Sequence, residues 1–267
     1  MTTFLANKHP LVFAHRGGCA LGPENTIAAF DRGRAAGADG FELDVRLSAD
    51  GIAVVCHDDT LERTTGAVGP VRARTAADLA RVDAGYRFVD AAGGFPFRGL
   101  GIGVPALRDV LERFRDMLLI VEMKGDTSEL GHAVVEAVRA ADASERVCAA
   151  GYGQRSLDTV RSTLPEMATS ASYREAQWAV YRSMARWPVR RAPYDAFQVP
   201  ESAGKLRIIS PRFVRHVHAA GQRLQAWTID DEADMRRLLG WGVDGLISNR
   251  PDVAVRVRDN FVRGVRL

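Results

Sequence analysis

The sequence predicts one α/β domain, a TIM (β/α)8 barrel with a small insertion between the second and third strands. Strand-like and helix-like segments alternate along the chain, as a parallel barrel requires. The length of 267 residues suits a single barrel, for which roughly 250 residues are typical. Charged or titratable residues repeatedly follow apolar runs, which is where the active sites of such barrels lie. We therefore expect residues 1–267 to form one domain.

Eight segments have the length and apolar character of buried parallel strands. These are residues 11–14, 40–45, 118–123, 146–151, 167–171, 195–199, 222–227 and 243–247. A further apolar run, 53–56, precedes His57. Because the carboxyl ends of parallel strands meet at one rim of a barrel, the residues that close these runs are expected to share one site.

Helix-like segments separate the strands. Pro23 before Glu24 and Gly37 after Ala36 delimit the first of them, since proline favours the start of a helix and glycine its end. The predicted helices are 24–36, 105–115, 129–142, 154–164, 173–187, 211–220, 231–240 and 251–258.

Residues 58–104 interrupt the alternation between the second and third strands. They are rich in glycine and arginine and include the run Gly93-Gly94-Phe95-Pro96-Phe97. The segment is too long for an ordinary loop between a strand and a helix. We therefore expect an insertion that extends over the mouth of the barrel.

The composition is that of an ordinary globular protein, with 46% hydrophobic residues. A net charge of +3 without a dense basic tract argues against a nucleic-acid partner. The apolar stretches reach only four or five residues, too short for a transmembrane segment. Three widely spaced cysteines predict reduced thiols, and the N-terminus does not resemble a secretory leader, so we expect a cytoplasmic protein. The oligomeric state stays open.

Three carboxylates stand at the ends of two predicted strands. Residues two apart face the same side of a strand, so Glu42 and Asp44 point together, as do Glu122 and Lys124. Adjacent carboxylates repel unless a cation lies between them, and hard oxygen donors favour Mg²⁺, Ca²⁺ or Mn²⁺. We predict that Glu42, Asp44 and Glu122 bind such an ion. Alternatively, Glu42 and Asp44 cap their strand and bind nearby arginines.

The ordered set of motifs resembles the glycerophosphodiester phosphodiesterase family. The matching landmarks span residues 11 to 252, nearly the whole chain. They are His15-Arg16-Gly17, Pro23-Glu24-Asn25-Thr26, residues 37–45, Asp50-Gly51, His57-Asp58, residues 61–66, Glu122-Met123-Lys124, Ala226-Trp227-Thr228 and residues 244–251. The departures are Met123, where an aliphatic residue is usual, and Thr228-Ile229-Asp230 after Trp227. Neither removes a group that the chemistry needs.

The remaining candidate residues suit cleavage of a phosphodiester. His15 and His57 fit general acid–base roles, because both protonation states of histidine exist near neutrality. Arg16 and Lys124 would neutralise phosphate oxygens. Trp227 could pack against the glycerol carbons, although a role in the core is an equal alternative. The alternative for each histidine is a purely structural role, and the alternative for Arg16 is a position on the surface.

The resemblance implies hydrolysis of a small-molecule glycerophosphodiester to glycerol 3-phosphate and an alcohol. It also implies that the pocket recognises glycerol at Trp227, while residues 58–104 cover the alcohol side. The rivals are a lysophospholipase D-like enzyme with a more apolar rim, a non-catalytic phosphodiester-binding barrel, and a metal-dependent barrel aldolase or isomerase. The last would not explain two histidines beside Arg16 and Lys124.

Other residues carry weaker signals. Glu24 and Asn25 either cap a helix or support the site, and Asp58 could orient His57. Asn249, before Arg250, is predicted to cap the last helix. A basic stripe with one aromatic residue favours a solvated helix face over a membrane-docking surface; it consists of Arg174, Trp178, Arg182 and Arg186.

Overall fold

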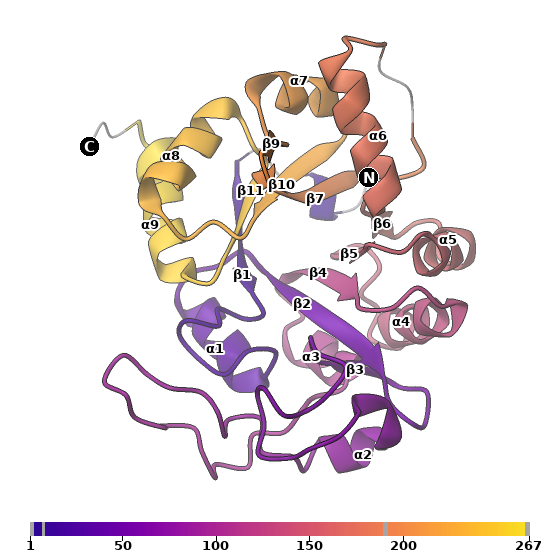
Figure 1. Cartoon of the computed structure of the whole chain (residues 1–267), viewed down its shortest axis with the longest axis vertical. Helices are drawn as coiled ribbons and strands as arrows, with labels where there is room; N and C mark the ends of the chain where they lie inside the picture. Colours follow the sequence, from indigo (N-terminus) through magenta and orange to yellow (C-terminus); the bar gives the residue numbers. More distant parts are fainter. Residues whose placement is uncertain (1–2, 7–8, 189–191, 265–267) are drawn as a thin grey trace.

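A computed structural model describes residues 3–6, 9–188 and 192–264, and within them eight parallel strands form a nearly closed barrel (Figure 1). Around the barrel the order is β6 (Ala168–Thr169), β5 (Val147–Gly151), β4 (Leu118–Met123), β2 (Gly40–Leu47), β1 (Leu11–His15), β11 (Gly245–Ser248), β10 (Arg223–Trp227) and β7 (Ala196–Pro200). Backbone hydrogen bonds from Ala171 to Ala196 and from Asp195 to Thr169 join β6 to β7. The predicted fold class is confirmed.

Helices surround this barrel, and each predicted strand and helix is present with bounds that differ by a few residues (Figure 1). The helices that follow barrel strands are α1 (Ile27–Ala35), α3 (Leu107–Arg113), α4 (Ser128–Ala140), α5 (Gln154–Thr163), α6 (Tyr173–Met184), α7 (Pro211–Ala219), α8 (Glu232–Trp241) and α9 (Pro251–Val262). The helix α1 begins later than predicted because the side chain of Thr26, not Glu24, caps it by accepting from the backbone N–H of Ala29.

Alternation along the strands divides the core into an inner and an outer layer. Inside the barrel, Phe13, Ile120 and Ile247 pack with Phe4, which the 3-10 helix η1 (Thr3–Leu5) supplies. The residues between them face the helices, as Val121 does among the side chains of the outer core. The same alternation turns every second residue inward near the carboxyl end of a strand. Polar residues at those positions therefore face the barrel mouth.

The insertion lies beside the barrel instead of over its mouth. The short strand β3 (Ala53–Val55) pairs antiparallel with the end of β2, and the chain then forms η2 (Val71–Ala73) and α2 (Ala76–Leu79). Apolar side chains of this region form a separate small cluster with β3. In Figure 1 the long loop that follows α2 lies beyond α1, away from the centre of the barrel. The prediction that residues 58–104 cover the mouth was wrong, because their apolar residues are buried against β3 instead.

Two further features bear on the predictions from sequence. None of the helices in the described residues is long and apolar enough to cross a membrane. Cys19, Cys56 and Cys148 are free thiols, as expected.

An additional hairpin, β8 (Ser202–Ala203) with β9 (Leu206–Arg207), follows β7.

The turn after β1 depends on Gly17, which has a φ of +84°. A Cβ atom there would lie 2.8 Å from the Phe30 ring and 2.9 Å from the backbone of Ala29. We expect Gly17→Ala to lower the free energy of unfolding by about 3 kcal/mol, the sum of left-handed backbone strain and overpacking. Gly51→Ala is the matched control, with a φ of +77° and no atom within 4 Å of the added carbon. It should cost only about 1 kcal/mol. Urea unfolding of both variants tests this, and equal losses would contradict it.

Candidate active site

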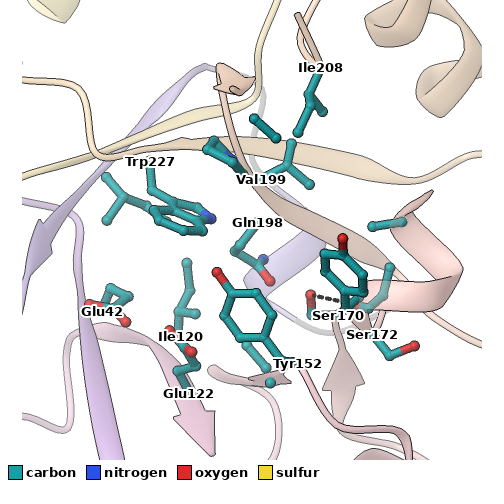
Figure 2. A pocket seen from close by; sticks show the side chains of 18 of the residues that line it. Glu42, Ile120, Glu122, Tyr152, Ser170, Ser172, Gln198, Val199, Ile208 and Trp227 are labelled. Carbon is teal, nitrogen blue, oxygen red and sulfur yellow. Dashed lines mark hydrogen bonds between the residues drawn. The ribbon is translucent and has the colours of Figure 1, made fainter. Parts of the chain in front are cut away.

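The ends of three neighbouring strands bring the predicted polar residues together. In the pairing of β1 with β2, His15 lies opposite Glu42, and in the pairing of β2 with β4, Asp44 lies opposite Glu122. Lys124 directly follows β4. Figure 2 shows Glu42 and Glu122 side by side at one end of a cavity. Parallel pairing thus gathers residues that are far apart in the sequence at one rim.

The three predicted metal ligands form a compact acidic group. Ligand oxygens of Glu42, Asp44 and Glu122 all lie within 4.8 Å of one another. Burial, then the neighbouring charges of Asp44 and Glu122, raise the pKa of Glu42 well above its ordinary value. Burial is also the main cause of a raised pKa at Glu122. This set of oxygen donors, two buried and one half-buried, needs added positive charge, and it fits a hard divalent cation.

Two cations of the chain contact this acidic group. Lys124 Nζ lies 3.0 Å from Asp44 Oδ1 and 2.8 Å from Glu122 Oε1. Arg16 Nε lies 3.3 Å from Asp44 Oδ2, and Arg16 Nη1 binds Glu24 at 2.8 Å. Three carboxylates therefore share two cations, which leaves an excess of negative charge. The Nε–H of Arg16 is buried and makes no hydrogen bond to the described residues, so its contact with Asp44 is an ion pair without hydrogen-bond geometry.

His15 is oriented by the last strand of the barrel. Its Nδ1 lies 2.6 Å from Asn249 Oδ1, and an amide oxygen only accepts, so the proton is on Nδ1. The Nε2 atom faces Glu42 Oε2 at 3.8 Å. Burial lowers the pKa of His15, which favours the neutral ring. The prediction that Asn249 caps the last helix was wrong, because Arg250 is the capping residue and the amide of Asn249 lies between His15 and Asp230.

His57 has an equivalent support from the insertion. Its Nδ1 lies 2.6 Å from Asp58 Oδ1. Burial raises the pKa of Asp58, but hydrogen bonds from Arg63 and His57 outweigh this effect and lower it to about 2. Asp58 is therefore an anion that accepts from Nδ1–H and leaves Nε2 of His57 available. Arg63 also binds Glu24, so the insertion reaches the site from the side.

Glu24 and Asn25 support the site and do not cap α1. Asn25 Nδ2 donates to Asp44 Oδ2 at 2.8 Å, and Asn25 Oδ1 accepts from the backbone N–H of Asp44. Asn25 has a φ of +59° and Arg16 a φ of +51°, in the left-handed region that non-glycine residues seldom adopt. Two such residues at one rim indicate that the surrounding structure holds the loop after β1 in place.

A cavity of about 400 Å³ extends from the acidic group across the barrel mouth. The side chains of His15, Arg16, His57, Lys124 and Trp227 line it, as predicted for one site. Trp227 also packs on the inner core. Its position therefore fits either of the two predicted roles, contact with the glycerol carbons or packing in the core. No residue of 58–104 lines the cavity.

The sequence did not predict the rest of the cavity wall, which comes from the segments after β5 and β6, from α6, from β7 and from the hairpin β8–β9 with the residue that follows it. The missed side chains include Tyr152, Tyr173, Gln198, Leu206 and Ile208. Tyr152 directly follows β5. His15 and Lys124 were predicted as site residues because each follows a predicted strand, so the same signal could have identified Tyr152. No comparable sequence signal marked the residues of α6 and the hairpin.

Comparisons with known proteins agree with this geometry. Residues 15–253 match the Glycerophosphoryl diester phosphodiesterase family. A glycerophosphodiester phosphodiesterase of Caldanaerobacter subterraneus subsp. tengcongensis is 32% identical, over 92% of this chain and 97% of its own length. Another from Bacillus subtilis is 29% identical, over 94% and 87%. An Oleispira antarctica phosphodiesterase, solved in complex with the product sn-glycerol-3-phosphate, has a TM-score of 0.76 and 26% identity, covering 94% of this chain and 97% of that one.

Proposed function

The chain belongs to the glycerophosphoryl diester phosphodiesterase family, and on this premise we propose that it hydrolyses glycerophosphodiesters to glycerol 3-phosphate and an alcohol. The observation that carries the proposal is the meeting at one rim of three carboxylates, two of them buried, with two cations and two histidines. The sn-glycerol-3-phosphate in the Oleispira antarctica structure supports glycerol 3-phosphate as the product.

His15 and His57 are the proposed acid and base. Each ring has Nδ1 beside an acceptor, Asn249 for His15 and Asp58 for His57, which fixes the ring and leaves Nε2 for the substrate. One Nε2 accepts a proton from the attacking hydroxyl, and the other, on a protonated ring, donates a proton to the departing alkoxide. The two roles together account for proton movement on both sides of the phosphorus.

Charge at the phosphate is balanced by the chain and by a bound cation. Arg16 and Lys124 neutralise the non-bridging phosphate oxygens through N–H donors. Glu42, Asp44 and Glu122 would hold the divalent ion, Mg²⁺, Ca²⁺ or Mn²⁺. When bound, this ion supplies Lewis-acid stabilisation of the charge that develops on the phosphate.

The experiment that tests the proposal is an assay of the purified protein with glycerophosphocholine, glycerophosphoethanolamine and glycerophosphoglycerol. Release of glycerol 3-phosphate and of the free alcohol is measured in the presence of Mg²⁺, Ca²⁺ or Mn²⁺. Turnover of at least one substrate supports the proposal. Binding of these compounds without any product would favour the non-catalytic barrel instead.

Trp227 is the proposed contact for the glycerol carbons, because it lines the cavity beside the polar cluster. We expect Trp227→Ala to raise KM by about tenfold for several glycerophosphodiesters alike, with a smaller change in kcat, as loss of uniform binding predicts. Trp241→Ala is the control, since this last residue of α8 packs against the outer core, with Arg207 of β9 over its ring, and does not line the cavity. A changed ranking of substrates in Trp227→Ala would mean that this residue contacts the departing alcohol instead.

A further inference from the structure

Arg63 of the insertion binds two carboxylates, and each of these carboxylates holds a residue of the candidate active site. Its Nη1 lies 2.8 Å from Glu24 Oε2 and its Nη2 lies 2.7 Å from Glu24 Oε1, so the guanidinium group binds both oxygens of one carboxylate. Its Nε donates to Asp58 Oδ2. Glu24 also accepts from Arg16 Nη1 at 2.8 Å. Asp58 also accepts from His57 Nδ1 at 2.6 Å. One side chain therefore links the supports of His57 and of Arg16.

The charges in this chain of contacts balance one another. Arg16 and Arg63 bring two positive charges, and the two carboxylates bring two negative ones. Burial raises the pKa of Glu24, but hydrogen bonding with Arg63 and the charge of Arg16 outweigh this effect and lower it, so Glu24 is an anion. Among the described residues, Arg63 is the one that donates a hydrogen bond to Glu24 Oε2. Without Arg63, this oxygen would draw further N–H groups of Arg16 away from a phosphate.

The loop that carries Arg63 is held by buried residues on both sides. Leu61 is buried in the small apolar cluster of the insertion. Thr65 is also buried, and its hydroxyl donates to the backbone carbonyl of Leu61 at 2.7 Å. The side chain of Arg63 is 48% exposed and does not line the cavity. It can therefore influence the reaction only through the two carboxylates that it binds.

We propose that Arg63 is a positioning residue for the reaction, because it holds the two carboxylates that orient His57 and Arg16. The inference rests on the proposed function, in which these two residues serve as an acid–base group and a phosphate-binding group. A guanidinium group suits the task, since its N–H donors point in fixed directions and three of them reach the two carboxylates. The insertion thus contributes to the reaction from beside the barrel.

Arg63→Ala should change kcat and KM together. We expect kcat for glycerophosphocholine to fall by about tenfold because His57 loses its fixed orientation, a loss at the lower end of what outer-shell partners of site histidines contribute. KM should rise by about tenfold because Arg16 no longer faces the phosphate. Arg81→Ala is the matched control, since Arg81 is an exposed arginine of the same insertion that pairs with Asp78 away from the cavity. A lower melting temperature with unchanged kcat and KM would overturn the proposal.

Added guanidinium ion separates positioning from a contribution to stability. Because the side chain of Arg63 is half exposed, guanidinium from solution can enter the space that Arg63→Ala leaves. At concentrations well below those that unfold the protein, kcat/KM of this variant should rise by about tenfold, whereas an equal concentration of potassium ion should have no such effect. An arginine that only stabilised the fold would give the opposite result, since guanidinium weakens folded proteins. Absence of any recovery would overturn the positioning role.

A double-mutant cycle tests the action through His57. In the His57→Ala background, Arg63→Ala should no longer lower kcat, because the ring that it orients is absent, whereas KM should still rise. An equal fall in kcat in both backgrounds would overturn the action through His57.

Phosphate binding distinguishes failure of this inference from failure of the proposed function. In the presence of Mg²⁺, calorimetry should show about tenfold weaker binding of inorganic phosphate by Arg63→Ala than by the wild type or Arg81→Ala. Equal affinities with unchanged turnover would overturn the positioning role and leave the proposed function standing. Weaker phosphate binding by Arg63→Ala, in a protein whose wild type hydrolyses no glycerophosphodiester, would support the action through Arg16 and overturn the proposed function.

Discussion

Exhaustive chelation of divalent metal is expected to abolish glycerophosphodiester hydrolysis, by about 10³-fold or more, and Mg²⁺, Ca²⁺ or Mn²⁺ to restore it. The physical reason is the acidic group at the barrel mouth. Glu42, Asp44 and Glu122 place ligand oxygens within 4.8 Å of one another, and Arg16 and Lys124 balance only part of their charge. Without the ion, a phosphate anion would meet this excess of negative charge.

A ligand variant separates loss of the metal from other effects of a chelator. Asp44→Asn keeps the shape of the side chain and removes its charge, so calorimetry should detect weaker metal binding. Added metal should raise the melting temperature of the wild type but not that of Asp44→Asn, since an ion that binds only the folded state stabilises it. Asp116→Asn is the control, because Asp116 is exposed and pairs with Arg34 outside the site. Full activity after exhaustive chelation would refute the metal site.

Replacement of either histidine is expected to lower kcat by about 10²–10⁴-fold, the usual contribution of general acid–base catalysis. His15→Ala and His57→Ala should fold and bind metal like the wild type, because neither ring belongs to the proposed ligand set. His132→Ala is the control, since His132 is exposed on α4, away from the cavity. Turnover near that of the wild type in either variant would remove that histidine from the mechanism.

A second substrate distinguishes the acid from the base. A nitrophenyl phosphodiester of glycerol has a leaving group that departs without a proton. The variant that lacks the acid should therefore regain most of its turnover on this substrate, whereas the variant that lacks the base should not. Recovery in both variants, or in neither, would contradict the assignment of one acid and one base.

Local patterns in the sequence predicted part of the fold and of the candidate site. Alternation on a strand is a local property, so spacing alone predicted that Glu42 and Asp44 share one face of their strand, and that Glu122 and Lys124 share one face of theirs. The barrel followed from the order of strands and helices, since parallel strands joined by helices have few ways to pack. Two predictions were wrong: the role of Asn249, which is the partner of His15, and the position of residues 58–104. The apolar wall from α6 and the hairpin β8–β9 was not predicted at all.

What the sequence by itself determined is therefore the set of chemical groups and the face on which each lies. The tertiary structure decided which groups meet. Asn249 reaches His15 across 234 residues because β11 pairs with β1 when the barrel closes. The insertion lies beside the barrel because burying its apolar residues against β3 leaves them out of water, and no local pattern predicts where they pack. The apolar wall of the cavity likewise exists only where α6 and the hairpin β8–β9 come together, so no local pattern in the sequence predicts it.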